Sequence, residues 1–143
     1  MKEKLLISAC LVGENTKYNG GNNYKTEIEE LKGKYDFVLI CPEMDGGLTC
    51  PRNPSEIIGD KVIMNTGKDV TFEYNKGAQI ALLKAQEFGC KKALLKEKSP
   101  SCGTHQIYDG SFTGRLIDGM GVTAKLLKEN GILVYSENEI KKL

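Results

Sequence analysis

The sequence predicts an α/β fold: a single domain, residues 1–143, with a mainly parallel open sheet of about four strands, a small β-hairpin excursion and helices on both faces. Two observations lead to this prediction. Short apolar runs alternate with longer segments of helical periodicity, as in βαβ units. The connections at one end of the expected strands are short, whereas those at the other end are long and rich in Gly. A chain of 143 residues is long enough to bury one independent core.

Four short apolar runs have the length of buried strands. They cover residues 5–10, 37–41, 92–96 and 132–135. The segment 55–70 predicts a β-hairpin, because two apolar runs flank the turn pair Gly59-Asp60. The segment 99–121 is expected to be mostly loop, with a smaller hairpin across residues 107–112.

Three segments have the periodicity and end signals of helices. They cover residues 24–33, 70–88 and 122–130. In the first, Thr26 and Glu29 have the spacing of a capping box and Gly33 marks the end; Gly89 and Gly131 follow the other two. Residues 11–23 and 43–54 are expected to be loops, and 138–143 a short tail.

Composition and charge exclude several classes of protein. The 20 basic and 19 acidic residues give a net charge of +1, which argues against a nucleic-acid-binding surface. No run approaches the roughly 20 apolar residues of a membrane span. The N-terminal residues 1–13 fit a first core strand better than a secretory signal. We therefore expect a cytoplasmic protein without membrane contact.

Three of the five cysteines follow the ends of predicted strands. Cys10, Cys41 and Cys102 each come at or shortly after the end of an apolar run. In a parallel α/β sheet these positions meet at the edge where ligands bind. The three thiols can therefore share one metal ion or cluster, and without an evident fourth protein ligand one metal position stays open. The alternative is that each is a small buried apolar residue.

The spacing of the cysteines does not name the metal. The paired short spacings of structural zinc sites are absent, and dispersed thiolates suit an iron–sulfur cluster. Cys50, in the same loop as Cys41, is an alternative fourth ligand. Cys90 follows Gly89 at the opposite edge of the sheet and is interpreted as structural.

Other polar residues lie close to the three cysteines in sequence. Glu43 is a candidate general base, with a solvated loop carboxylate as the alternative. Ser99 and Ser101 flank Pro100 before Cys102 and are candidate substrate or cluster contacts, with simple turn formation as the alternative. Arg52 is a candidate substrate clamp, and otherwise a surface ion pair. The single histidine, His105, is left out of the core site.

Five ordered segments resemble a bacterial family long catalogued as domain of unknown function 523 and now linked to thiouracil desulfidase activity. The similarity covers nearly the whole chain. The segments are ISACLVG (7–13), CPEMDGGLTCPRNPSEI (41–57), KSPSCG (98–103), IYDGSFTG (107–114) and GVTAKLL (121–127).

This resemblance implies a [4Fe–4S] cluster with three cysteine ligands, Cys10, Cys41 and Cys102, and an active site with Glu43 as the acid/base and Ser99 as the serine. It implies non-redox desulfuration of a thiolated pyrimidine, of the thiouracil or thiouridine type, to the oxo-pyrimidine, with the sulfur taken by the open iron. The family often carries Asp in place of Asn19 and Thr or a similar residue in place of Cys50. The second difference implies that Cys50 is dispensable.

Two other functions remain compatible with the residues. A non-catalytic iron–sulfur sensor or electron carrier needs a fourth protein ligand and has no use for Glu43 or Ser99. A small-molecule binding protein needs no metal at all.

Overall fold

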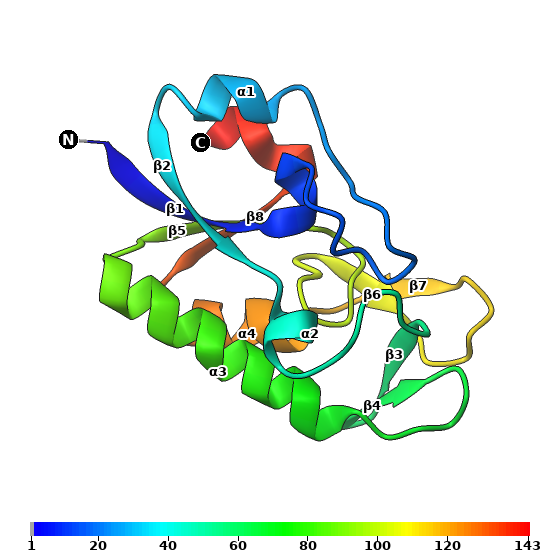
Figure 1. The fold of residues 1–143 in the computed structure, drawn as a ribbon. Coiled ribbons are helices and arrows are strands. Elements are labelled where there is room, and N and C mark those ends of the chain that lie inside the picture. The colour runs from blue at the N-terminus through cyan, green and yellow to red at the C-terminus, as the bar shows by residue number, and fades with distance from the viewer. Residues whose placement is uncertain (1) are drawn as a thin grey trace.

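Four parallel strands form the central sheet, in the order β2-β1-β5-β8 (Figure 1). The computed structural model describes residues 2–143. The strands are β1 (Glu3–Ser8), β2 (Tyr35–Ile40), β5 (Lys92–Leu95) and β8 (Leu133–Ser136). Because Ser8 pairs with Ile40 and Ile7 with Leu94, β1, β2 and β5 end at one edge. The loops that follow these strands start side by side.

Helices cover both faces of the sheet, so its inner strands are apolar on both sides. One face is covered by α3 (Thr71–Phe88) and α4 (Val122–Glu129), the other by α1 (Ile28–Leu31) and the 3₁₀ helix η2 (Glu137–Lys142) (Figure 1). Leu6 of β1 belongs to the core beneath α3 and α4, whereas its neighbours Leu5 and Ile7 belong to the opposite core. The predicted α/β class is confirmed.

Two antiparallel hairpins lie beyond the carboxyl edge of the sheet (Figure 1). The first pairs β3 (Ser55–Ile58) with β4 (Lys61–Met64), as predicted, and packs with Tyr74 of α3 in a third apolar cluster. The second pairs β6 (Gln106–Tyr108) with β7 (Leu116–Asp118). The hairpins wall off a space at that edge.

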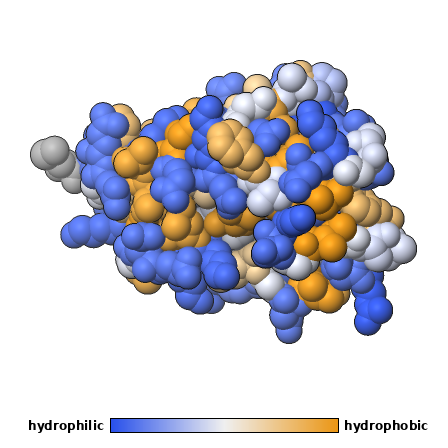
Figure 2. Space-filling model, turned by 90° about the horizontal axis from the view of Figure 1, so that it is seen from below, coloured by the Kyte–Doolittle hydropathy of each residue, from blue (hydrophilic) through white to orange (hydrophobic). Residues whose placement is uncertain are grey.

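The outer surface on the α3 side carries separate apolar patches among charged side chains (Figure 2). Phe72, Leu83 and Phe88 of α3 are exposed. No helix within residues 2–143 is long and apolar enough to cross a membrane.

The first predicted helix is much shorter than expected. Residues 24–33 were predicted to be helical, but only α1, Ile28–Leu31, is. Glu27 stands at the N-cap without a side-chain hydrogen bond, so the predicted capping box of Thr26 and Glu29 does not form. Ile28 and Leu31 are the buried residues of α1. Two buried side chains give too little tertiary contact to stabilise a longer helix in this segment.

Two other segments differ from prediction. The expected loop 43–54 begins within α2 (Pro42–Asp45), where Pro42 suits the first helical turn. The predicted hairpin 107–112 is wrong, because β6 pairs with the more distant β7. The N–H groups of Gly110 and Phe112 instead donate to the carboxylate of Glu56 (2.9 and 3.1 Å), which removes them from strand pairing.

Candidate active site

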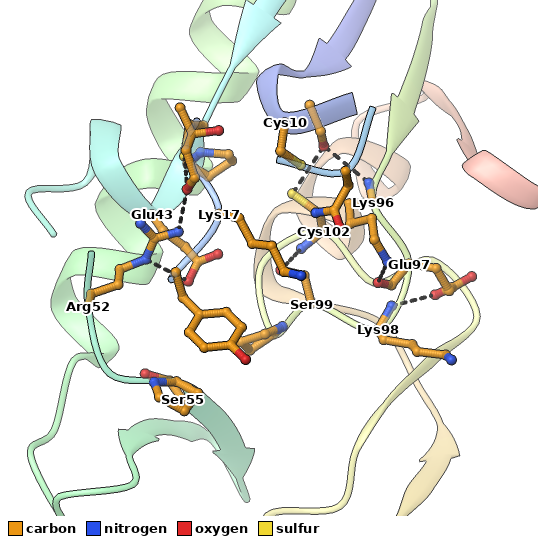
Figure 3. A pocket seen from close by; sticks show the side chains of 18 of the residues that line it. Cys10, Lys17, Glu43, Arg52, Ser55, Lys96, Glu97, Lys98, Ser99 and Cys102 are labelled. Atoms are coloured by element: carbon orange, nitrogen blue, oxygen red, sulfur yellow. Dashed lines mark hydrogen bonds and ion pairs between the residues drawn. The ribbon is translucent and has the colours of Figure 1, made fainter. Parts of the chain in front are cut away.

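A cavity of about 580 Å³ lies at the carboxyl edge of the sheet (Figure 3). Its walls come from the loops after β1, β2 and β5, from β3 and from the β6–β7 hairpin. Of the predicted site residues, all except Ser101 line it: Cys10, Cys41, Glu43, Arg52, Ser99 and Cys102. The expectation that residues far apart in sequence meet at this edge agrees with the structure.

Cys10 and Cys41 reach the cavity from short helical turns after neighbouring strands. Cys10 lies in the 3₁₀ turn η1 (Ala9–Val12) that follows β1, and Cys41 precedes α2 directly after β2. Burial raises the pKa of both thiols. A hydrogen bond with the Asn23 side chain acts in the opposite direction on the pKa of Cys10.

Cys102 is the most deeply buried of the three, with 5% of its surface exposed. The hydroxyl of Ser8, the last residue of β1, donates to Cys102 Sγ at 3.5 Å. Burial is the main reason that the pKa of Cys102 rises to about 12, and the charges of Glu43, Cys10 and Cys41 add to the rise. Such a thiol becomes a thiolate at neutral pH only beside a strong positive charge, as a metal centre provides.

A buried carboxylate organises the loop that carries Ser99 and Cys102. Glu97 is 5% exposed. Its Oε1 accepts four backbone hydrogen bonds of 2.7 to 3.2 Å, from the N–H groups of Lys98, Thr104, His105 and Gln106. Burial by itself would raise the pKa of Glu97, but these bonds lower it below its usual value. One ionised oxygen thus ties the two ends of the loop together.

The N-terminus of α4 fixes the other side of the same loop. Backbone N–H groups at the start of α4 donate at 2.8 to 2.9 Å to carbonyl oxygens of Gly103, Pro100 and Ser101. A Cβ on Gly121 would lie 2.5 Å from the carbonyl group of Ser101, so this contact requires glycine. The N–H groups of Gly121, Val122 and Thr123 are therefore used within the protein.

Ser99 is oriented by the turn that it begins. Its Oγ accepts the N–H groups of Ser101 (3.0 Å) and Cys102 (3.1 Å). A serine hydroxyl has one donor hydrogen besides its two lone pairs. Since both lone pairs are used and Ser99 lines the cavity, its O–H hydrogen is the part left for a ligand.

Glu43 enters the cavity from the first turn of α2, and 18% of its side chain is exposed. Two buried groups donate to its Oε1: the Tyr74 hydroxyl, and Arg52 Nε at 3.4 Å. A carboxylate held at the edge of a cavity is suited to accept a proton from water or substrate.

No three His, Cys, Asp or Glu side chains among residues 2–143 are arranged to bind one metal ion. The idea of a single ion shared by Cys10, Cys41 and Cys102 is therefore unsupported. A polynuclear iron–sulfur cluster does not need such convergence, because each thiolate binds a different iron.

The sequence matches the 2-thiouracil desulfurase family over residues 5–139. The chain belongs to this family. As a family of enzymes, the desulfurases agree with the predicted desulfidase class, and the resemblance to the domain of unknown function 523 is confirmed.

Two relatives of this chain cover almost its full length. The uncharacterized protein YbbK of Bacillus subtilis (strain 168) is 42% identical over 146 residues, with 95% of this chain and 97% of YbbK covered. A solved structure of the [4Fe-4S]-dependent thiouracil desulfidase TudS is 41% identical and superposes with a TM-score of 0.93, covering 99% of this chain and 95% of that one. The chain therefore has the fold of TudS.

Two of the predicted substrate contacts are placed differently from expectation. Ser101 is fully buried, and its Oγ lies 2.9 Å from Thr123 Oγ1, away from the cavity. Arg52 lines the cavity, but only 3% of its side chain is exposed. Besides Glu43, its guanidinium donates to the carbonyl oxygens of Thr16 (2.9 Å) and Thr49 (3.2 Å). Arg52 thus braces the wall of the cavity.

The remaining cysteines and the histidine lie outside the cavity. Cys50 Sγ donates to the carbonyl oxygens of Asn15 (3.2 Å) and Lys17 (3.4 Å). Cys90 is buried in the core beneath α3 and α4. The His105 ring lies 2.6 Å from Glu139 Oε1 and is exposed. The cysteine thiols that line the cavity are those of Cys10, Cys41 and Cys102.

Sequence reasoning missed several polar groups at or behind the cavity: Tyr74, Glu97, Ser55 and the lysines 17, 96 and 98. Ser55 Oγ is buried without a hydrogen-bond partner of normal geometry among residues 2–143. A signal for Glu97 exists in the sequence, since it is an acidic residue close behind the apolar run of β5. The sequence has no comparable signal for Tyr74, which looks like an ordinary core residue of α3.

Proposed function

We propose that the protein hydrolyses the thiocarbonyl group of thiolated pyrimidines, of the thiouracil or thiouridine type, to the oxo-pyrimidine. The observation that carries this proposal is the meeting of three cysteine thiols, Glu43 and Ser99 in one cavity. Membership of the 2-thiouracil desulfurase family and the similarity to TudS support it.

We assign Cys10, Cys41 and Cys102 as ligands of a [4Fe–4S] cluster. The donor set fits this group, because the three thiols line one cavity from three separate strand ends but do not form a site for one ion. With three ligands from the protein, a bound cluster would leave one iron with an open position, which would supply Lewis acidity toward the thiocarbonyl sulfur. Cys50 makes other contacts and does not line the cavity.

Glu43 acts as the general base in this proposal. Its carboxylate takes a proton from a water molecule, and the water oxygen attacks the ring carbon that carries the sulfur. The carbon–oxygen bond forms, the carbon–sulfur bond then breaks, and the sulfur leaves as sulfide. The overall change is thiocarbonyl plus water to carbonyl plus hydrogen sulfide, so no external electron donor or acceptor is needed.

Ser99 orients the substrate. The free O–H hydrogen of Ser99 donates to a heteroatom of the ring and stabilises negative charge there as water adds. Lys17, Lys96 and Lys98 line the cavity together with Glu43, Glu56 and Glu97, so its wall carries charges of both signs.

The test is anaerobic reconstitution with iron and sulfide, followed by incubation with 2-thiouracil and 4-thiouracil. We expect loss of the thiopyrimidine absorbance, release of sulfide and formation of uracil in equal amounts. Glu43→Gln should retain the cluster and lose turnover, whereas Cys102→Ser should lose the cluster. Cluster-loaded protein that releases no sulfide from either compound would contradict the proposal. The cytoplasmic location remains a prediction that cell fractionation can check.

A further inference from the structure

Tyr74 is a buried tyrosine whose hydroxyl is used at the active site rather than only in the core. It lies in the first turns of α3 and is 1% exposed. Its ring packs in an apolar cluster with Leu48, Val62 and Val70, while its hydroxyl donates to Glu43 Oε1. Tyr74 does not itself line the cavity.

The hydroxyl of Tyr74 is a permanent donor. Burial, and then the charge of Glu43, raise the pKa of Tyr74 well above its usual value. The phenol therefore stays protonated, and its one hydrogen is directed to Glu43. The acceptor of this hydrogen bond is the carboxylate of the candidate base and not a backbone carbonyl.

Both donors to Glu43 act on the same oxygen. Arg52 Nε reaches Oε1 at 3.4 Å, and the Tyr74 hydroxyl also reaches Oε1. Glu43 Oε2 accepts no hydrogen bond from any group among residues 2–143. The two oxygens are thus unequal: one is held from behind by the protein, and the other is left for a partner in the cavity.

Two glycines make this contact possible. A Cβ on Gly77 of α3 would lie 1.8 Å from the carbonyl oxygen of Pro42, and a Cβ on Gly46 would lie 1.9 Å from that of Glu73. Without side chains at these positions, the backbone of α2 rests directly on α3. Tyr74 lies one turn from Gly77, so the close approach brings its hydroxyl to Glu43 at the start of α2.

We propose that Tyr74 is a positioning residue for the desulfuration: together with Arg52 it holds Glu43 by Oε1, so that Oε2 is the oxygen that takes the proton from water. This inference rests on the proposed function and adds to it the identity of the reacting oxygen. Pre-positioning of a base in this way lowers the cost of reaching the transition state.

Tyr74→Phe is the decisive variant, because it keeps the buried ring and removes only the hydroxyl. Tyr35→Phe is the matched control, since Tyr35 is also buried but its hydroxyl accepts from Lys92 Nζ at 3.2 Å, at the opposite end of the sheet. For each protein, kcat and KM are measured per bound cluster, with iron content and the cluster absorbance as separate readouts.

For Tyr74→Phe we expect kcat to fall on the order of tenfold with unchanged KM, because loss of a hydrogen bond to a charged group affects the base and not substrate binding. Cluster content and absorbance should remain those of the wild type, and Tyr35→Phe should match the wild type in every readout. In the Glu43→Gln background, Tyr74→Phe should cause no further loss of the residual rate.

A kcat for Tyr74→Phe equal to that of the wild type, or an equal loss in both backgrounds, would overturn the inference. Anaerobic crystal structures of the wild type and Tyr74→Phe give a readout that does not depend on turnover. We expect Glu43 to leave its single orientation in the variant, and an unchanged Glu43 would refute the role of Tyr74. Wild-type protein that is fully loaded yet inactive would instead refute the proposed function.

Discussion

The contact between α2 and α3 leads to a prediction about Gly77 that runs against the usual behaviour of glycine in helices. Alanine normally stabilises a helix interior by about 1 kcal/mol relative to glycine. At Gly77, however, the added Cβ would lie 1.8 Å from the carbonyl oxygen of Pro42 and 2.6 Å from its carbon. Both atoms belong to the backbone and have no rotamer that relieves the overlap. We therefore expect Gly77→Ala to destabilise the protein.

The structure allows the size of this effect to be worked out. Real Cβ atoms essentially never approach other heavy atoms within 3.0 Å, so α2 and α3 must separate by more than an ångström. Overpacking of this kind costs about 1–3 kcal/mol. Separation also weakens the hydrogen bond from Tyr74 to Glu43, which adds about 1.5–3 kcal/mol if it is lost entirely. After the gain in helix propensity, we expect a net loss of about 2–4 kcal/mol.

The assay is urea unfolding of the wild type and the variant, supported by thermal unfolding. A loss of this size corresponds to a fall in Tm of roughly 5–15 °C for a chain of this length. Gly33→Ala is the control, because a Cβ there would meet its nearest neighbour at 3.6 Å, and we expect a change within about 0.5 kcal/mol. If Gly77→Ala is as stable as the wild type, the close packing of α2 on α3 is wrong.

Three further predictions concern other parts of the molecule. Cys50→Ser should bind as much iron per chain as the wild type, because the Cys50 thiol contacts only loop carbonyl oxygens. Iron is measured after anaerobic reconstitution, and a lower iron content in the variant would show that Cys50 is a fourth ligand. Glu97→Ala leaves four backbone N–H groups without their acceptor and should cost on the order of 2–4 kcal/mol in urea unfolding, with Glu97→Gln less harmful. The pKa of Glu139 is lowered to about 2, since hydrogen bonds from His105, Ser136 and Lys142 outweigh the effect of burial. Because the unfolded chain binds this proton more readily than the folded one, the free energy of unfolding should fall as the pH is lowered from 4.5 to 2. Glu139→Gln should lose less stability over that range than the wild type.

The strands themselves and the shared edge of the site follow from local sequence patterns. Short apolar runs predict strands whatever their neighbours, and parallel strands joined by helices must end at one side of the sheet. Cys10 and Cys41 were predictable as site residues for this reason, because each follows the last residue of its strand within two positions. Cys102 is a harder case, since it lies seven positions after Leu95, the end of β5.

Tertiary contacts decided the rest. Cys102 and Ser99 reach the cavity because Glu97 and the start of α4 fold their loop back, through hydrogen bonds between residues that no local pattern pairs. Ser101, next to Cys102 in sequence, is turned away to Thr123 by the same loop. The roles of Tyr74 and Gly77 appear only once α2 lies on α3. Hydrophobic periodicity predicts which face of a helix or strand is buried. The hydrogen-bond partner of a buried polar group depends instead on how closely two elements approach each other, and no local sequence pattern predicts that distance.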